Sequence, residues 1–430
     1  MSEIYERWRL PRSLNTGEIV GRLLQLRDPF PVPMGLSGIV LTTANRKLIS
    51  YWSNPDYFNK VGPRWQPINE WTGPRSAFMP TGEDWGIRSK GAKDAYRNDL
   101  FGQWQGEPIA EITKALNIPS DGMVDNLYSK VKALALQIAA DLLYGVKIEM
   151  AQAERIASAY GTLNAYNARN SLTGGLLDRL RCPPTNFDAF AAFKEDELPR
   201  ASASPFDWLH GDFTESLKAI WNFGRMLVQQ SKQSAIAEKM RNAGLSEDDQ
   251  IREATVQIGG AHGAPGALIS SVLTCLAMPE NIQYQRMLRS QPDLLPSVIQ
   301  ETLRLYPPFW VQLRHCVSNV NLPGISIGAG TDVLFCTYVA DRDPKIYGPK
   351  ADRFMPERFA SNPILRKHLT SFGFGQRRCP AGHIGVEIAR LVVQEIVEKY
   401  SFEAVGTPRF TFGDTLHPSD TNRMLFIARS

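Results

Sequence analysis

The chain has 430 residues, of which 43% are hydrophobic and 21% are charged, and its formal net charge is +4. This composition is ordinary for a globular protein with a large core, and it excludes a disordered or low-complexity chain. The positive excess is too small to indicate a nucleic-acid partner.

The chain has five cysteines, an odd number, and none belongs to a Cys-x-x-Cys pair. This spacing excludes a zinc ribbon and a disulfide framework. The first residues lack a basic segment followed by an apolar one, and the longest apolar run, Val333 to Ala340, has only the length of a strand. We therefore expect a cytoplasmic protein without a membrane anchor.

The first hundred residues are rich in Pro, Gly and Trp, which predicts irregular structure with short strands. From Val124 to Leu142 apolar residues recur every three or four positions. This period predicts a helix that is capped by Ser120 or Asp121 and stopped by Gly145. Residues 213–242 predict one further helix or a pair of helices.

Residues 247–278 predict one long helix that ends at Pro279, and residues 297–306 predict another. Residues 322–339 contain segments in which apolar and polar residues alternate, separated by turn signals. This pattern favours a small β-hairpin region. A final helix is expected over residues 382–400. Since no repeat, linker or charge block divides the sequence, we expect a single, mainly helical domain over residues 1–430 with a minor β region.

The most specific motif is Phe372-Gly-Phe-Gly-Gln-Arg-Arg-Cys379-Pro-Ala-Gly382. Its first glycines allow a tight turn and a close approach of the backbone to a flat ligand. Cys379 precedes a predicted helix, whose N-terminal N–H groups, together with Arg377 and Arg378, would stabilise a thiolate. The motif therefore predicts a metal-bound sulfur, with a buried structural cysteine as the alternative.

This segment resembles the haem-binding loop of the cytochrome P450 family, whose pattern is Phe-x-x-Gly-x-[His/Arg]-x-Cys-x-Gly. The match includes Phe372, and the departure is Ala381 in place of the usual glycine. The resemblance implies a cytochrome P450 fold with haem b, in which Cys379 is the proximal iron ligand and Arg377 meets a propionate. A thiolate ligand donates electron density to iron and favours cleavage of the O–O bond.

A second match to the family is Glu301-Thr-Leu-Arg304. Its two charged residues are three positions apart, so on a helix they lie on the same face and can pair. The segment around Arg358 resembles the one whose arginine joins this pair in the family. The resemblance implies a structural triad of Glu301, Arg304 and Arg358 that holds the loop carrying Cys379; a surface position for Arg358 is the alternative.

A third match is Pro307-Pro308 followed by Arg314, which by resemblance reaches the other propionate. Phe309, Trp310 and Val311 then fall where the family lines its substrate pocket, although plain core packing is the alternative. Trp85 loosely matches a tryptophan that contacts the haem.

The long helix departs from the family pattern [Ala/Gly]-Gly-x-[Asp/Glu]-Thr, whose acid and alcohol relay protons. The aligned segment is Gly259-Gly260-Ala261-His262-Gly263-Ala264-Pro265. Gly260 keeps the groove for haem and oxygen, but His262 replaces the acid and Gly263 replaces the threonine. The usual relay at these catalytic positions is therefore missing.

Three interpretations remain open. The substrate or an ordered water supplies the hydroxyl group, or His262 acts as an acid–base group near neutral pKa with O2 or peroxide. In the third, the enzyme isomerises or dehydrates its substrate without net oxygen activation. Alternatively, His262 bonds a backbone carbonyl or points away from the haem.

The resemblance favours an oxidoreductase that hydroxylates or couples a small organic molecule in secondary metabolism, using O2. A basic face would bind an acidic ferredoxin or flavodoxin, and its residues are Lys90, Lys93, Arg97, Arg377 and Arg378. The alternative is that these charged residues only form a solvated surface and bind no partner. Rival functions are a haem sensor or carrier without turnover and, more remotely, a cysteine hydrolase.

Overall fold

The computed structural model describes the main part of the chain, namely residues 30–33, 39–60, 100–103, 116–168, 211–231, 234–322 and 325–429, with single positions between 24 and 114. Trp85, Lys90, Lys93 and Arg97 lie outside the described residues, so their expected roles stay predictions.

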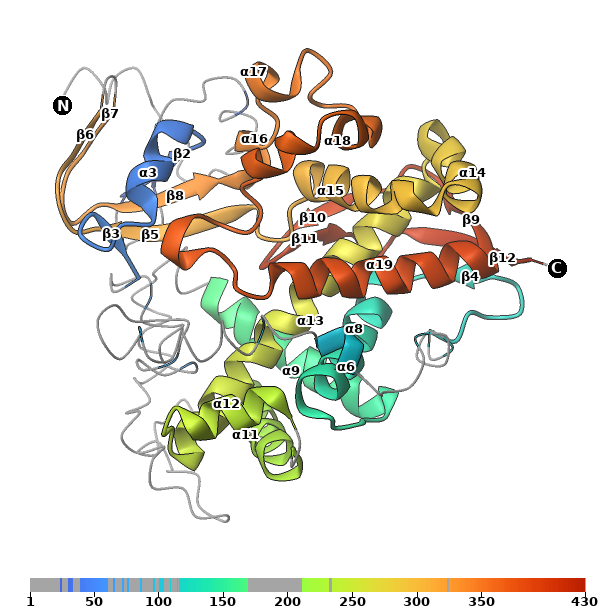
Figure 1. The fold of residues 1–430 in the computed structure, drawn as a ribbon, viewed down its shortest axis with the longest axis horizontal. Coiled ribbons are helices and arrows are strands. Elements are labelled where there is room, and N and C mark those ends of the chain that lie inside the picture. Colours follow the sequence, from blue (N-terminus) through green and yellow to red (C-terminus); the bar gives the residue numbers. More distant parts are fainter. Residues whose placement is uncertain are drawn as a thin grey trace.

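Helices dominate the described part (Figure 1). The longer ones are α8 (Leu127–Tyr144), α9 (Met150–Ala168), α11 (Gly211–Gln230), α12 (Ala235–Asn242), α13 (Glu247–Ala277), α14 (Ile282–Ser290), α15 (Leu295–Leu305) and α19 (Gly382–Lys399). Short helical segments are η2 (Arg46–Leu48), α3 (Ile49–Trp52), α6 (Leu100–Gln103), η7 (Pro279–Asn281), η8 (Pro292–Leu294), α16 (Thr337–Ala340), α17 (Pro344–Tyr347), α18 (Glu357–Ser361), η9 (Pro363–His368) and η10 (Gly375–Arg377). The helices expected from periodicity are confirmed, and residues 213–242 form a pair.

Helix α8 ends where the sequence predicted but begins later. Gly145 caps its C-terminus at φ 65°, a conformation that glycine adopts without steric cost. Its N-cap is Asn126, and the expected caps Ser120 and Asp121 were wrong. The reason is that Val124 belongs to a short strand, so the apolar period extends beyond the helix.

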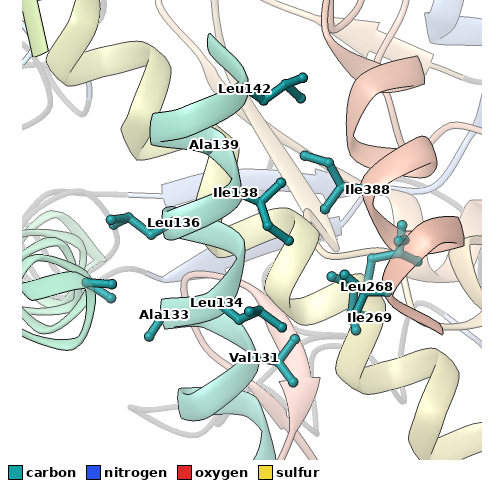
Figure 2. Packing of buried hydrophobic residues seen from close by; sticks show 14 of the residues in the cluster. Val131, Ala133, Leu134, Leu136, Ile138, Ala139, Leu142, Leu268, Ile269 and Ile388 are labelled. Carbon is teal, nitrogen blue, oxygen red and sulfur yellow. The ribbon is translucent and has the colours of Figure 1, made fainter. Parts of the chain in front are cut away.

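Helices α8 and α19 both pack against α13, which forms the centre of the main core. Figure 2 shows apolar side chains of α8 directed toward Leu268 and Ile269 of α13 and toward Ile388 of α19. The two backbones come close at Gly266, where an added Cβ would lie 2.7 Å from the Cα of Lys132. Gly266 therefore lets two helix backbones meet.

In the described part of the chain, the strands are short and form four sheets. The strands are β1 (Phe30–Pro33), β2 (Ile39–Thr43), β3 (Phe58–Asn59), β4 (Met123–Val124), β5 (Val311–Cys316), β6 (Val320–Leu322), β7 (Ile325–Ile327), β8 (Asp332–Cys336), β9 (Tyr400–Val405), β10 (Phe410–Phe412), β11 (Leu416–Pro418) and β12 (Arg423–Ala428). Their orders are β1-β2-β8-β5-β3, β4-β12-β9, β10-β11 and β6-β7.

The expected hairpin over residues 322–339 is only partly right. Strands β6 and β7 pair antiparallel as a hairpin, but β8 leaves it and pairs parallel to β2 and antiparallel to β5. A second apolar cluster lies on this larger sheet and includes Trp52, Phe335 and Trp310. The larger sheet and the helical core occupy opposite sides of the molecule in Figure 1.

Among the described residues, no single helix has both the length and the apolar composition to cross a membrane. Within the same described ranges, one pair passes the test when its two parts are taken together: α13 and Pro279–Ser290, which are bent by 85° relative to each other.

Candidate functional site

The loop before Cys379 turns at two glycines in the left-handed region, Gly373 at φ 70° and Gly375 at φ 53°. A Cβ at Gly375 would collide with the side chain of Ser53, so only glycine allows this contact. The Cys379 N–H donates to the carbonyl of Phe372 over 2.8 Å, which closes the turn. The ring of Phe372 packs on Gly382 at the start of α19 and thereby fixes the loop to that helix.

Cys379 is exposed, yet the surrounding protein raises the pKa of its thiol above the ordinary value. Burial is the main cause, while the Ala381 N–H and the charge of Arg378 lower the pKa only in part. Without a metal, desolvation outweighs these two effects, and the stabilisation of a metal-bound thiolate by the helix N-terminus and the arginines stays a prediction. A metal cation on the sulfur would reverse this balance, since a coordinating thiol is deprotonated outright.

The structure brings the expected triad together. Arg304 makes a bidentate pair with Glu301 at 2.8 Å for both oxygens, and both side chains are fully buried. The Nε atom of Arg358 lies 3.5 Å from the same carboxylate. Buried charges require such pairing and further hydrogen bonds, and the Met355 N–H supplies one to Glu301 at 2.9 Å.

The triad is linked to the cysteine loop through Asp341, which belongs to none of the sequence motifs. Arg304 donates to the backbone carbonyl of Asp341 at 3.0 Å. The buried carboxylate of Asp341 accepts the Thr370 N–H at 3.0 Å and pairs with Arg46 at 2.9 Å. The Ser371 hydroxyl also donates to the carbonyl of Leu303 at 3.0 Å, so α15 holds the start of the loop directly.

Arg314 and Arg377, the expected propionate contacts, lie close enough to influence each other. Burial, and then the charge of Arg377, lowers the pKa of Arg314 to about 9. Burial lowers the pKa of Arg377 to about 10. The pKa of Lys60 falls well below its ordinary value, first through burial and then through both arginines. The result is a desolvated cationic cluster, and sequence reasoning missed Lys60.

The three residues expected to line a substrate pocket lie in different environments. Trp310 is buried, donates its indole N–H to the Gly413 carbonyl at 3.0 Å and packs edge-on against Phe412. It therefore holds the turn between β10 and β11. Phe309 is 49% exposed, and Val311 begins β5. Pocket lining by these residues stays a prediction.

The space beside helix α13 is open at Gly260 and Gly263, the two glycines identified from the sequence. A Cβ added at Gly260 or Gly263 would meet no atom of the described residues within 4 Å, although Gly263 is buried. Pro265 lies inside α13 without ending it, and its ring faces Gly385 of α19. The helix thus leaves room for a ligand on one side while it remains packed on the other.

His262 is fully buried, and its ring lies 4.7 Å from the ring of Tyr160 on α9. Its Nδ1 lies 2.8 Å from the carbonyl of Ile258. A carbonyl only accepts, so Nδ1 carries the proton and Nε2 is a buried acceptor with no hydrogen-bond partner among the described residues.

The expected near-neutral pKa of His262 was wrong. Burial, and then the charge of Lys132, lowers the pKa to about 4, against weaker opposing effects from the Ile258 carbonyl and Asp414. The imidazole is therefore neutral near pH 7. The structure shows the arrangement in which this histidine bonds a backbone carbonyl.

Comparisons with known proteins relate this chain to one family. The sequence model of the cytochrome P450 family matches residues 277–422, which include the triad and Cys379. Cytochrome P450 714C2 of Oryza sativa subsp. japonica is 33% identical over 141 residues, which are 32% of this chain and 26% of that protein. Germacrene A hydroxylase of Saussurea costus is 35% identical over 114 residues, 25% of this chain and 23% of that protein.

These matches span about a quarter of the length of the curated relatives. The whole fold is compared better through a solved structure, a 6-coordinated cytochrome P450 from Thermus thermophilus. It superposes with a TM-score of 0.71 over 96% of this chain and 98% of that one, at 17% sequence identity. Because the superposition covers 96% of this chain, the similarity of fold extends beyond residues 277–422.

Proposed function

Because the chain belongs to the cytochrome P450 superfamily, we propose that it is a haem-thiolate oxidoreductase that oxidises a small organic molecule with O2. The observation that supports this most strongly is the geometry of Cys379. Its loop is turned by Gly373 and Gly375, tied to α15 through Ser371 and opened toward solvent at the thiol.

Members of this superfamily bind haem b, and the residues present fit that group. Cys379 would supply the iron ligand, and Arg314 and Arg377 would pair with the propionates. The open space beside Gly260 and Gly263 would admit the macrocycle and a substrate. When bound, haem with a thiolate ligand supplies the oxygen chemistry, because the thiolate donates electron density to the iron.

The proton supply must differ from the usual acid and threonine. Gly263 has no side chain, and the Nδ1 proton of His262 is donated to the Ile258 carbonyl. With its pKa near 4, the neutral imidazole holds no second proton to donate near pH 7. An ordered water or a hydroxyl group of the substrate in the space beside Gly263 would therefore carry protons.

The electrons would come from an acidic ferredoxin or flavodoxin. Arg378 is exposed on the loop of Cys379, where a docked partner would come nearest to the sulfur. Charge attraction of this kind weakens as salt screens it. Reduction by a ferredoxin should therefore slow as ionic strength rises, and a rate indifferent to salt would count against this donor surface.

The proposed function is tested by turnover of the purified, haem-loaded protein. Small organic molecules that shift the Soret band would be selected first and then incubated with a ferredoxin system or with hydrogen peroxide. We expect an oxidised product that contains an oxygen atom from O2 or a new coupled bond with the ferredoxin system. Haem binding without any product, in either system, would favour a sensor or carrier.

A variant with His262 replaced separates the proton routes. His262→Gln keeps a polar side chain but has no imidazole, and we expect it to retain most of the product formation. A large loss of turnover, with the protein still folded and haem-loaded, would reinstate His262 as the acid–base group.

A further inference from the structure

We propose that the ion pair between Arg46 and Asp341 positions the cysteine loop (residues 370–379) and thereby determines how firmly the sulfur of Cys379 is held on bound haem iron. This assignment rests on the proposed function, because it concerns the ligand of the same cofactor. Neither residue belongs to a motif identified from the sequence, and Arg46 lies far outside the matched residues 277–422.

Residues 46–53, which contain η2 and α3 and end at Ser53, contact the cysteine loop in two places. Just before the loop, the guanidinium of Arg46 donates to the carbonyl of His368 at 2.9 Å. Farther along, Ser53 lies so close to Gly375 that a Cβ added there would collide with its side chain. One short segment therefore supports the chain both before and within the turn that leads to Cys379.

Arg46 also ties this segment to the end of α16. Its Nη2 donates to the carbonyl of Ala340 at 3.0 Å and to the carboxylate of Asp341 at 2.9 Å. Asp341 in turn accepts the Thr370 N–H at 3.0 Å for both oxygens and the Ser371 hydroxyl at 3.3 Å. The pair thus joins segments that are far apart in the sequence, and it joins them at the first residues of the loop.

The carboxylate of Asp341 is fully buried, so its charge depends on the groups around it. Arg46, Thr370 and Ser371 are all donors to it, and donors stabilise the anion. Burial raises the pKa of Asp341 to about 6, and the charge of Arg46 is the largest of the effects that lower it. Without Arg46 the pKa would rise further, and near pH 7 the carboxylate would be buried without its paired cation.

Loss of Arg46 should therefore expose a pH dependence near neutrality. A carboxyl group whose pKa is raised by burial weakens the closed structure as pH rises toward that pKa. In the wild type this effect is complete near pH 6, so the anchoring of the loop is constant above about pH 7. In a variant without Arg46 the raised pKa moves the effect upward, and anchoring weakens further between about pH 7 and 8.

Other titratable groups beside Asp341 do not supply this dependence. Burial raises the pKa of Cys336 to about 12 and raises that of Tyr347 as well, so both stay neutral in this range. Arg304, which donates to the backbone carbonyl of Asp341, keeps its charge. His368 contributes its carbonyl to the pair, while its side chain is exposed.

The experiment follows the red-shifted Soret band of the reduced carbon-monoxide complex of the haem-loaded protein, in urea below the unfolding transition. The variants are Arg46→Gln, Arg46→Lys, the double variant Arg46→Gln with Asp341→Asn, and the control Arg390→Gln, which breaks a half-exposed ion pair. At pH 7 we expect Arg46→Gln to lose the band about tenfold faster or more than the wild type, because a buried charge is left without its partner. The loss should accelerate toward pH 8.

The other variants separate positioning from plain stability. The double variant should lose the band more slowly than Arg46→Gln and at a rate independent of pH, because a neutral amide needs no counter-charge. Arg46→Lys keeps the charge without the planar set of donors, so its rate should be intermediate and independent of pH. The control should behave as the wild type does.

Hydrogen exchange of the haem-free protein supplies a second readout. The Thr370 amide should exchange faster in Arg46→Gln than in the wild type, while the amides of α13 exchange at the wild-type rate.

Band loss from Arg46→Gln at the wild-type rate would overturn the assignment, as would a pH dependence that persists in the double variant or a loss that merely follows unfolding by circular dichroism. Should Arg46→Gln not fold, band loss from Arg46→Lys at the wild-type rate would overturn it instead. In each case a thiolate-type spectrum of the wild type would leave the proposed function intact. A wild-type protein that bound no haem through sulfur would overturn both.

Discussion

Two glycines three residues apart on α13 should respond oppositely to the same substitution, Gly→Ala. At Gly266 the new Cβ would lie 2.7 Å from the Cα of Lys132, 3.1 Å from its Cβ and 3.2 Å from its N. At Gly263 the new Cβ would meet nothing within 4 Å. The first position serves the contact between α8 and α13, and the second serves the open space beside the helix.

The magnitude follows from that geometry. Ordinary contact begins at 3.4 Å, so the backbones at Gly266 must separate by about 0.7 Å (3.4 minus 2.7). Overpacking of this kind costs about 1–3 kcal/mol. Both substitutions also gain about 1 kcal/mol of helix propensity, which cancels when the two variants are compared. We therefore expect Gly266→Ala to be about 1–3 kcal/mol less stable than Gly263→Ala.

Urea unfolding followed by far-UV circular dichroism measures this difference, with equal slopes as the condition for comparing midpoints. The Soret band adds a second readout, because only Gly263→Ala introduces a methyl group into the space proposed for haem and substrate. If Gly266→Ala were as stable as Gly263→Ala, the close approach of α8 and α13 would be wrong.

Two other predictions concern buried charge. Folding lowers the pKa of His262 from 6.5 to about 4. Between these two pH values the unfolded chain binds a proton that the folded protein does not bind. The free energy of unfolding therefore decreases by about 3 kcal/mol as pH falls from 6.5 to 4. His262→Gln should flatten that part of the curve of unfolding free energy against pH, and an unchanged slope would contradict the burial argument. Glu301→Gln should cost about 3–5 kcal/mol, because it leaves the buried guanidinium of Arg304 without its anion. The matched control, Glu387→Gln in the half-exposed pair with Arg390, should cost under about 1 kcal/mol in the same urea titration, and equal losses would refute a special role for the triad.

The fold was predictable where the signal is local. The apolar period found α8, and Gly145 marked its end because a left-handed cap favours glycine. The start was missed because Val124 pairs with Met424 of β12, a partner far along the chain. The parallel pairing of β8 with β2 was missed for the same reason, since no local pattern specifies a distant strand.

The same distinction between local and distant signals applies to the residues of the site. Cys379 and the pair Glu301 and Arg304 were identifiable because each motif lies within one loop or one helix turn. Lys60 and Asp341 were not, because only the tertiary fold brings Lys60 under the influence of Arg314 and Arg377 and brings Asp341 to Thr370. The pKa of His262 was misjudged because the sequence does not show that the side chain is fully buried.

The proposed function depends above all on the binding of haem iron by the thiolate of Cys379. Iron K-edge X-ray absorption of the haem-loaded protein tests it directly, because sulfur scatters differently from nitrogen or oxygen. We expect one sulfur neighbour of iron in the wild type and none in Cys379→Ser, together with loss of the red-shifted Soret band of the reduced carbon-monoxide complex. An iron with only nitrogen and oxygen neighbours in the wild type would contradict the account.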